Sequence, residues 1–311
     1  MLLGLAFIVM AAAPISAAES PKAADLPPVT SEQKQKIAAA APGSGEAAKP
    51  LRPRHVLIFS RADGWVHRCI PVAVEALVEI GRSSGAYAAV ASDDLAMFTP
   101  ERLAAFDAIV LNNTTRLVIK DPAQKAALLD FVQNGGGLAG IHAAADNFAD
   151  WPDGGALIGA QFASHAWGSR GTWAVKIDDP GHPVTAPFHG RGFWINDEIY
   201  ELTTPYSRDT HHVLLSLDMT QAHNRSVKPV GPMPGDFPVA WVKRAGRGRV
   251  FYSSLGHNLE IYWNPIVLRH YLAGIQYALG DLAATDLPSA SLQPGPVPAL
   301  APAGPPPGKI P

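Results

Sequence analysis

The chain has 311 residues, of which 47% are hydrophobic and 17% are charged, with a formal net charge of −2 at pH 7. This near-neutral balance argues against electrostatic binding to nucleic acid or to an anionic membrane. The single cysteine, Cys69, excludes an intramolecular disulfide and a cysteine-rich zinc site.

The first 18 residues have the pattern of a secretory signal peptide. An apolar run over residues 2–10 leads to Ser16-Ala17-Ala18, a small-x-small cleavage pattern. The run is too short to span a bilayer, and no cysteine follows it closely to carry a lipid anchor. We therefore expect a periplasmic or secreted protein that begins near Glu19 and has no membrane anchor after cleavage. No Lys or Arg precedes the apolar run, which leaves a misplaced start codon or a weak signal as alternatives. An unprocessed tail on a cytosolic protein is a further alternative, but it leaves the apolar run unburied.

Composition divides the rest of the chain into three parts. Residues 19–52 are rich in Ala, Pro, Lys and Glu, which predicts a flexible linker. Residues 286–311 carry repeated Pro and Gly, which predicts a disordered tail. Residues 53–285 have the size of one larger α/β domain.

The first half of this domain alternates between strand and helix patterns. Apolar runs predict strands at residues 55–60, 87–92, 106–113 and 138–141. Proline near the first helical position predicts intervening helices that begin at Pro71, Pro100 and Pro122. Such alternation predicts an α/β three-layer sandwich with a mostly parallel central sheet and right-handed crossovers.

The second half is less regular. Residues 173–177 alternate as a half-exposed strand does. Residues 239–243 and 249–254 flank Ala245-Gly246-Arg247-Gly248, which predicts a β-hairpin. A final helix is predicted to begin at Pro265.

Polar side chains follow several of the predicted strands. His67 follows the first strand, Asn113 the third, His142 and Asp146 the fourth, and His257 the second strand of the hairpin. Ligands of open parallel sheets bind beyond the carboxyl ends of the strands, so these residues predict one polar pocket.

His142 is the most informative of these residues. The segment Gly140-Ile141-His142-Ala143-Ala144 resembles the sharp strand-to-helix turn that presents nucleophiles in α/β enzymes. The presented group here is an imidazole, which can act as a base, an acid or a metal ligand. The alternative is a histidine that caps the following helix.

Two further segments are candidates. Asp197 and Glu198 are adjacent on an extended segment, so only one of them can face a pocket, and a solvated acidic turn is the alternative. His165 and Trp167 place an imidazole near an indole, a combination that suits a sugar because its C–H faces pack on rings. The alternative is a core tryptophan beside a satisfied histidine.

Taken together, these segments resemble the ThuA-like (trehalose utilisation) family over roughly residues 55–282. The segments that carry the resemblance are Gly64-Trp65-Val66-His67, residues 135–142, Asp146-Asn147-Phe148, His165-Ala166-Trp167, Asp197-Glu198-Ile199-Tyr200, residues 238–241 and residues 248–257.

The resemblance implies a flavodoxin-like fold, similar to that of class I glutamine amidotransferases. Those enzymes carry a cysteine at the strand-to-helix elbow, where this chain has His142, and His257 resembles their later histidine. Cys69 lies elsewhere, so thiol-dependent glutamine hydrolysis is not expected. The resemblance also favours Glu198 over Asp197 as the pocket residue.

The resemblance further implies a role in carbohydrate metabolism, with a disaccharide or keto-sugar as the small-molecule partner. The expected catalytic residues are His142, Glu198 and His257. The expected substrate-binding residues are His67, Asn113, Asp146, His165 and Trp167, with Asp146 as a possible orienter of an imidazole. The sequence does not indicate an oligomeric state.

A divalent metal is also expected, with zinc the best match to neutral imidazole and carboxylate ligands. Its ligands would be His67, His142, Glu198 and His257. A hydrogen-bonded His–Glu network that binds sugar hydroxyls directly is the alternative. At the level of function, the alternatives are a non-catalytic sugar-binding or accessory protein and a metal-dependent hydrolase of another substrate class.

Overall fold

The computed structural model describes residues 25–232, 235–304 and 306. The predicted signal peptide, residues 1–18, lies outside the described residues. Among the residues that are described, no helix has the length and apolarity to cross a membrane.

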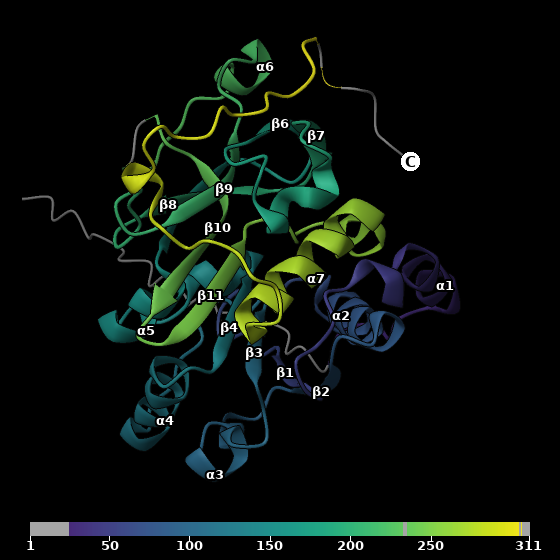
Figure 1. Ribbon diagram of the computed structural model, residues 1–311, viewed down its shortest axis with the longest axis vertical. Helices are drawn as coiled ribbons and strands as arrows, with labels where there is room; N and C mark the ends of the chain where they lie inside the picture. Colours follow the sequence, from purple (N-terminus) through teal and green to yellow (C-terminus); the bar gives the residue numbers. More distant parts are fainter. Residues whose placement is uncertain (1–24, 233–234, 305, 307–311) are drawn as a thin grey trace, which may run out of the picture.

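A nine-stranded sheet forms the middle layer, in the order β2-β1-β3-β4-β11-β10-β9-β6-β7 (Figure 1). Neighbours from β2 to β11 pair in parallel, and the remaining neighbours pair antiparallel. A separate pair joins β5 (Gln161–Trp167) to β8 (Ile199–Thr203). The strands of the large sheet are β1 (His55–Phe59), β2 (Ala88–Ser92), β3 (Ala108–Asn112), β4 (Gly137–Ile141), β6 (Thr172–Ile177), β7 (Phe193–Asn196), β9 (His212–Leu217), β10 (Pro238–Ala245) and β11 (Gly248–Ser253).

Helices cover both faces of the parallel part of the sheet (Figure 1). One face carries α2 (Ile70–Ser84) and α7 (Pro265–Leu279), with α1 (Ser31–Ala40) packed on α2. The other face carries α3 (Pro100–Leu103), α4 (Pro122–Gln133) and α5 (Pro152–Ile158), and the short α6 (Ala222–Arg225) lies beside β6.

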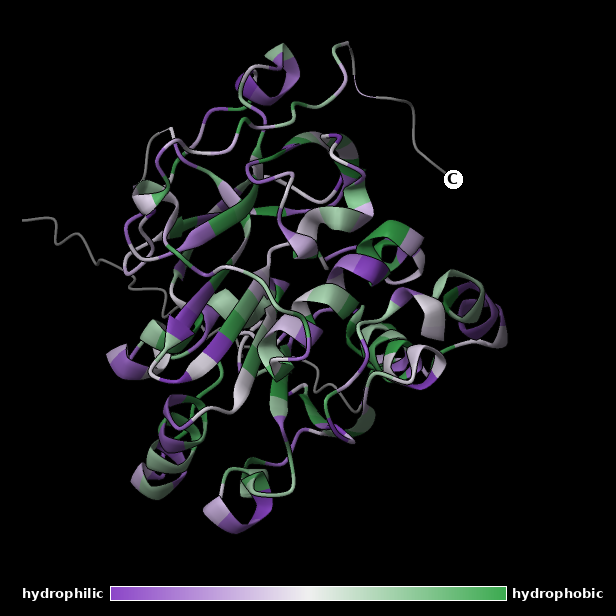
Figure 2. Cartoon of the chain, in the orientation of Figure 1, coloured by the Kyte–Doolittle hydropathy of each residue, from purple (hydrophilic) through white to green (hydrophobic). Residues whose placement is uncertain are grey.

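Alternation along the strands divides the apolar core between these two faces. In β1, Val56 and Ile58 pack with α2 and α7, whereas Leu57 and Phe59 pack with the α3–α4–α5 side. Figure 2 shows the hydrophobic strands enclosed between helices whose hydrophilic residues face outward. The predicted three-layer α/β sandwich is confirmed, and so is the hairpin, whose turn contains Gly246 at φ +59°.

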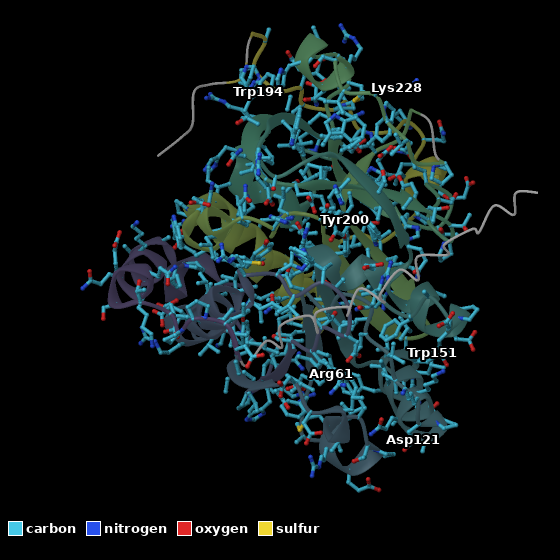
Figure 3. The ribbon with its side chains drawn as sticks, turned by 180° about the vertical axis from the view of Figure 1, so that it is seen from behind. Arg61, Asp121, Trp151, Trp194, Tyr200 and Lys228 are labelled. Carbon is cyan, nitrogen blue, oxygen red and sulfur yellow. The ribbon has the colours of Figure 1, made fainter. Side chains whose placement is uncertain are left out.

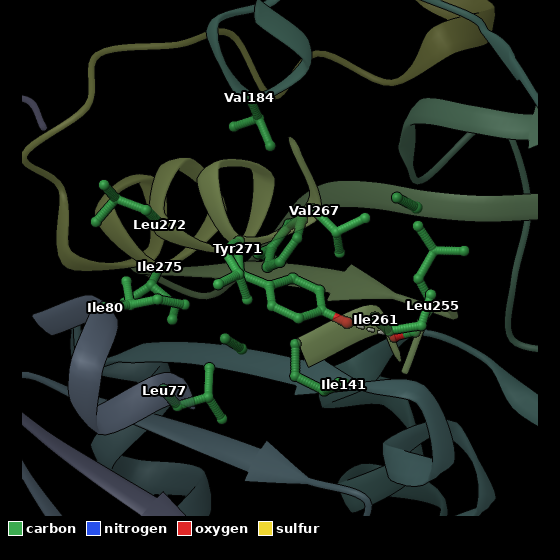
Figure 4. Packing of buried hydrophobic residues seen from close by; sticks show 14 of the residues in the cluster. Leu77, Ile80, Ile141, Val184, Leu255, Ile261, Val267, Tyr271, Leu272 and Ile275 are labelled. Atoms are coloured by element: carbon green, nitrogen blue, oxygen red, sulfur yellow. Dashed lines mark hydrogen bonds between the residues drawn. The ribbon is translucent and has the colours of Figure 1, made fainter. Parts of the chain in front are cut away.

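The packing of α7 also fixes a loop that carries a site residue. Tyr271, Leu272 and Ile275 lie in a cluster with Leu77 and Ile141 (Figure 4). Burial of each such aliphatic or aromatic side chain contributes about 1.5–3 kcal/mol. The Tyr271 hydroxyl donates a hydrogen bond to the Leu255 carbonyl at 2.8 Å, so the helix anchors the chain just before His257.

The expectation of a flexible linker over residues 19–52 is wrong for residues 31–40. Thr30 and Gln33 form a capping box at the start of α1, and Ile37 and Ala40 are buried against the core. Ala, Lys and Gln are strong helix formers, so this polar segment forms a helix that packs on the core through only Ile37 and Ala40.

The expectation of a disordered tail over residues 286–311 is wrong for much of its described part. Ala299 and Ile177 exchange two backbone hydrogen bonds of 2.9 Å, and the Ala301 N–H donates to Asp218. The Trp194 indole donates to the Pro302 carbonyl at 3.0 Å. Prolines lack an N–H donor, but the carbonyl groups of the tail remain available as acceptors.

Candidate metal centre

Four side chains meet beyond the carboxyl ends of the parallel strands. His67, His142, Glu198 and His257 each offer one ligand atom, and these atoms all lie within 4.8 Å of one another. His67 lies between β1 and α2, His142 directly follows β4, Glu198 connects β7 to β8, and His257 follows β11. The structure thus brings together all four residues expected to bind metal, although they are far apart in sequence.

His142 occupies a strand-to-helix elbow with φ +48°, a conformation that is uncommon for a residue other than glycine. Its Nδ1 lies 2.7 Å from the Ser254 carbonyl oxygen. Because a carbonyl only accepts, Nδ1 carries the proton and Nε2 presents its lone pair to the cluster. Nε2 is buried without a hydrogen-bond partner.

The spacing around His142 Nε2 suits a cation. Glu198 Oε2 lies 3.6 Å away, and Glu198 Oε1 lies 3.9 Å from His257 Nε2. Both distances are too long for a hydrogen bond. Two ligands of a tetrahedral ion with bonds of about 2.1 Å are about 3.4 Å apart.

The other two imidazoles are oriented in the same manner. Nδ1 of His257 lies 3.2 Å from Asn258 Oδ1, and Nδ1 of His67 lies 3.2 Å from Thr115 Oγ1. The three rings are nearly perpendicular in pairs, at 87–88°, with centroids 5.0–5.4 Å apart. In each ring Nδ1 has a polar partner outside the cluster, which leaves Nε2 as the candidate ligand atom. This arrangement is usual for metal-bound histidine.

Burial favours the neutral forms of two of these imidazoles, those of His67 and His142. Burial and the neighbouring imidazoles lower the pKa of His67 to about 2, and burial lowers the pKa of His142. Burial acts to raise the pKa of Glu198, but the surrounding histidines outweigh it and lower that pKa. Three imidazole nitrogens and one carboxylate form a donor set that fits zinc.

Asp197 and Glu198 face different surroundings, as expected for adjacent residues on an extended segment. Asp197 is fully buried and accepts the backbone N–H groups of Gly256, His257 and Asn258 at 2.6–3.1 Å. Burial raises the pKa of Asp197 to about 7, an effect that these donors oppose. Asp197 thus holds the loop of His257, a role that the sequence did not indicate.

The cluster opens onto a pocket of about 710 Å³. Among the expected substrate-binding residues, His67, Asp146 and His165 line it. Trp65, which is 71% exposed, and Tyr200, whose ring centroid lies 4.3 Å from that of His142, also line the pocket. Tyr200 lies near the middle of the molecule in Figure 3.

Asn113 and Trp167 do not line this pocket. The Asn113 amide donates to the Tyr262 hydroxyl at 2.8 Å, behind the site. Trp167 is fully buried, and its indole N–H donates to the Asn224 carbonyl. A register shift between Ser164 and Trp167 breaks the alternation of β5, which explains why Trp167 and the exposed His165 do not share a face.

Asp146 is not placed as an orienter of an imidazole, since Ser254, Asn258 and Thr115 take that role. The Asp146 carboxylate instead lies 3.9 Å from the Arg116 guanidinium. Burial raises the pKa of Asp146 to about 6, and Arg116 opposes this effect.

The fold and the His/Glu cluster define an α/β protein with a polar pocket at the carboxyl edge of its sheet. The chain belongs to the ThuA family, described as trehalose utilisation, which matches residues 55–278. No functionally curated protein matches the sequence.

Two solved structures share the fold. A ThuA-like protein from Bacteroides uniformis ATCC 8492 is 24% identical with a TM-score of 0.61, over 75% of this chain and 94% of that one. A ThuA-like protein from Parabacteroides merdae ATCC 43184 is 17% identical with a TM-score of 0.57, over 75% of this chain and 93% of that one.

Proposed function

We propose that the protein is a metal-dependent enzyme that acts on a disaccharide or keto-sugar. The observation that carries the proposal is the buried, unpartnered Nε2 of His142, which faces Glu198 and lies beside two similarly oriented imidazoles. A buried polar atom without a partner costs about 1–3 kcal/mol, and a bound cation would remove this cost. Membership of a trehalose-utilisation family supports the choice of a sugar.

His67, His142, Glu198 and His257 would hold the metal. A divalent metal there would supply Lewis-acid polarisation of a substrate oxygen. Proton transfer falls to groups that line the pocket. Asp146, with its pKa raised to about 6, can accept or donate a proton near neutral pH. In a keto-sugar, that proton would be exchanged with the carbon next to the carbonyl group.

Thiol chemistry is not part of the proposal. Cys69 is buried, its Sγ lies 3.2 Å from the Gly256 carbonyl oxygen, and burial raises the pKa of the thiol well above its usual range. A nucleophilic cysteine needs exposure and a lowered pKa. We therefore infer that the protein does not hydrolyse glutamine through Cys69.

The test is turnover by purified protein before and after metal removal. Disaccharides and keto-disaccharides, with carboxylic and phosphate esters as comparison substrates, are incubated with native, chelator-treated and zinc-reconstituted protein. We expect sugar turnover that chelation abolishes and zinc restores. Turnover of esters alone would assign another substrate class, and sugar binding without turnover would assign a binding protein. Sugar turnover that survives complete metal removal would reject a catalytic role for the metal, while the assignment of the pocket would stand.

Export stays a separate proposal, supported by the apolar run over residues 2–10 and the Ser16-Ala17-Ala18 pattern. Sequencing of the mature N-terminus in envelope or medium fractions should give a start near Glu19. Recovery of intact Met1 on cytosolic protein would reject export.

A further inference from the structure

A second hollow adjoins the pocket at the metal centre. Its volume is about 470 Å³, against about 710 Å³ for the first. Arg116, Asp146 and Phe162 line both hollows, so these three residues form the boundary between them. A ligand anchored at the His/Glu cluster and longer than the first hollow would extend past this boundary.

The second hollow combines an aromatic wall with charged groups. The rings of Phe148 and Trp151 meet edge to face, with centroids 5.0 Å apart. Lys125 Nζ lies 5.4 Å from the centre of the Trp151 ring. Trp151 lies farther from the middle of the molecule than Tyr200 in Figure 3. Apolar ring surfaces with a few hydrogen-bonding groups suit a small hydroxylated ring that has both C–H faces and polar edges.

The backbone around this hollow is held in uncommon conformations. Arg116 has φ +50° and Phe148 has φ +62°, like His142 in the metal centre at φ +48°. Hydrogen bonds brace this region: the Arg116 N–H donates to the Asp146 carbonyl, and the Leu117 N–H donates to Asn147 Oδ1. Residues held in such conformations cluster at ligand sites, where the surrounding structure has to maintain them.

We propose that the second hollow is the subsite for the second ring of a two-ring carbohydrate whose reacting ring lies at the His/Glu cluster. This inference rests on the proposed function and adds the chemical size of the substrate and the residues that recognise its far half. The Arg116–Asp146 pair then lies beside the linkage between the two rings, where a charged pair can hydrogen-bond to the bridging region.

Val118 offers a way to close the second hollow without disturbing the first. It lines only the second hollow of the two and is 45% exposed, so a larger side chain there does not enter the core. Val90 on β2 is a matched control, because it is 49% exposed and lines neither hollow. The variants are Val118→Trp and Val90→Trp in the full-length protein.

Calorimetry would measure the dissociation constants of glucose, trehalose, maltose and cellobiose for each protein. We expect at least one disaccharide to bind about 10-fold more tightly than glucose, because a second ring gains aromatic contact. Val118→Trp should abolish this advantage and leave glucose affinity unchanged, whereas Val90→Trp should keep both. Lys125→Ala, with exposed Lys120→Ala as its control, should weaken the disaccharide alone.

Each other outcome overturns the subsite in a recognisable way. The subsite is rejected if glucose and every disaccharide bind with equal affinity. It is also rejected if Val118→Trp still binds a disaccharide more tightly than glucose. In both cases, sugar turnover would still support the proposed function. If none of the four sugars binds, the subsite falls, and the turnover experiment decides whether the sugar assignment falls with it.

Discussion

A His142→Asn variant is expected to lose stoichiometric metal and sugar turnover while keeping its fold. Asparagine tolerates the left-handed conformation that His142 adopts at φ +48°. Its amide nitrogen can replace Nδ1 as donor to the Ser254 carbonyl, so the change removes chiefly the Nε2 ligand atom. Mutating a residue that merely orients a metal ligand costs about 10–100-fold in affinity, so loss of a ligand should exceed about 100-fold.

His189→Asn is the matched control for this variant. His189 also has a positive φ, +54°, but it is exposed and lies outside the cluster. Metal content by mass spectrometry of native protein, zinc affinity by competition with a chelator, and thermal unfolding would be compared for both variants. His189→Asn should match the wild type in metal content. A His142→Asn protein that retains one tightly bound metal would reject the centre, and one that loses metal but keeps full turnover would reject its role in catalysis.

The parallel half of the sheet could be predicted from sequence because its strands are buried on both faces. Such strands appear in the sequence as continuous apolar runs. A proline at the start of an intervening helix marks where a run has ended, as at Pro100 and Pro122. The carboxyl ends of parallel strands meet at one edge, so the polar residues that follow them had to converge. His67, His142 and His257 were therefore predictable as a group once the sheet was correct.

The residues that could not be predicted depend on local register and on single contacts. Trp167 was expected beside a sugar, but the irregularity in β5 turns it into the core. Helix α1 buries only Ile37 and Ala40, and two such positions do not make an apolar periodicity that can be recognised in the sequence. Asp197 was recognisable only as the neighbour of Glu198, because its three partners are backbone groups about sixty residues further along the chain.

Asp197 gives the second large expected effect, because it positions His257, one of the proposed metal ligands, from outside the candidate metal centre. Its carboxylate accepts three consecutive backbone N–H groups and so fixes the loop from which His257 enters the cluster. An Asp197→Asn variant would replace one acceptor oxygen by an NH₂ group that faces these donors. A buried donor that loses its acceptor costs about 1–3 kcal/mol, so the variant should unfold at a lower temperature. Since His257 would lose its fixed position, zinc affinity should also fall by about 10–100-fold.

Asp218→Asn separates the effect on the metal from the effect on stability. Asp218 is equally buried and also accepts three hydrogen bonds, from the Thr220 N–H, the Thr220 hydroxyl and the Ala301 N–H, but it belongs to no part of the site. Both variants should be destabilised in thermal unfolding, and only Asp197→Asn should lose zinc affinity in a chelator competition below the unfolding temperature. Equal zinc affinity in the two variants would mean that the loop holds His257 in place without the carboxylate. The positioning of His257 would then have to come from Asn258 and from the Tyr271–Leu255 anchor alone.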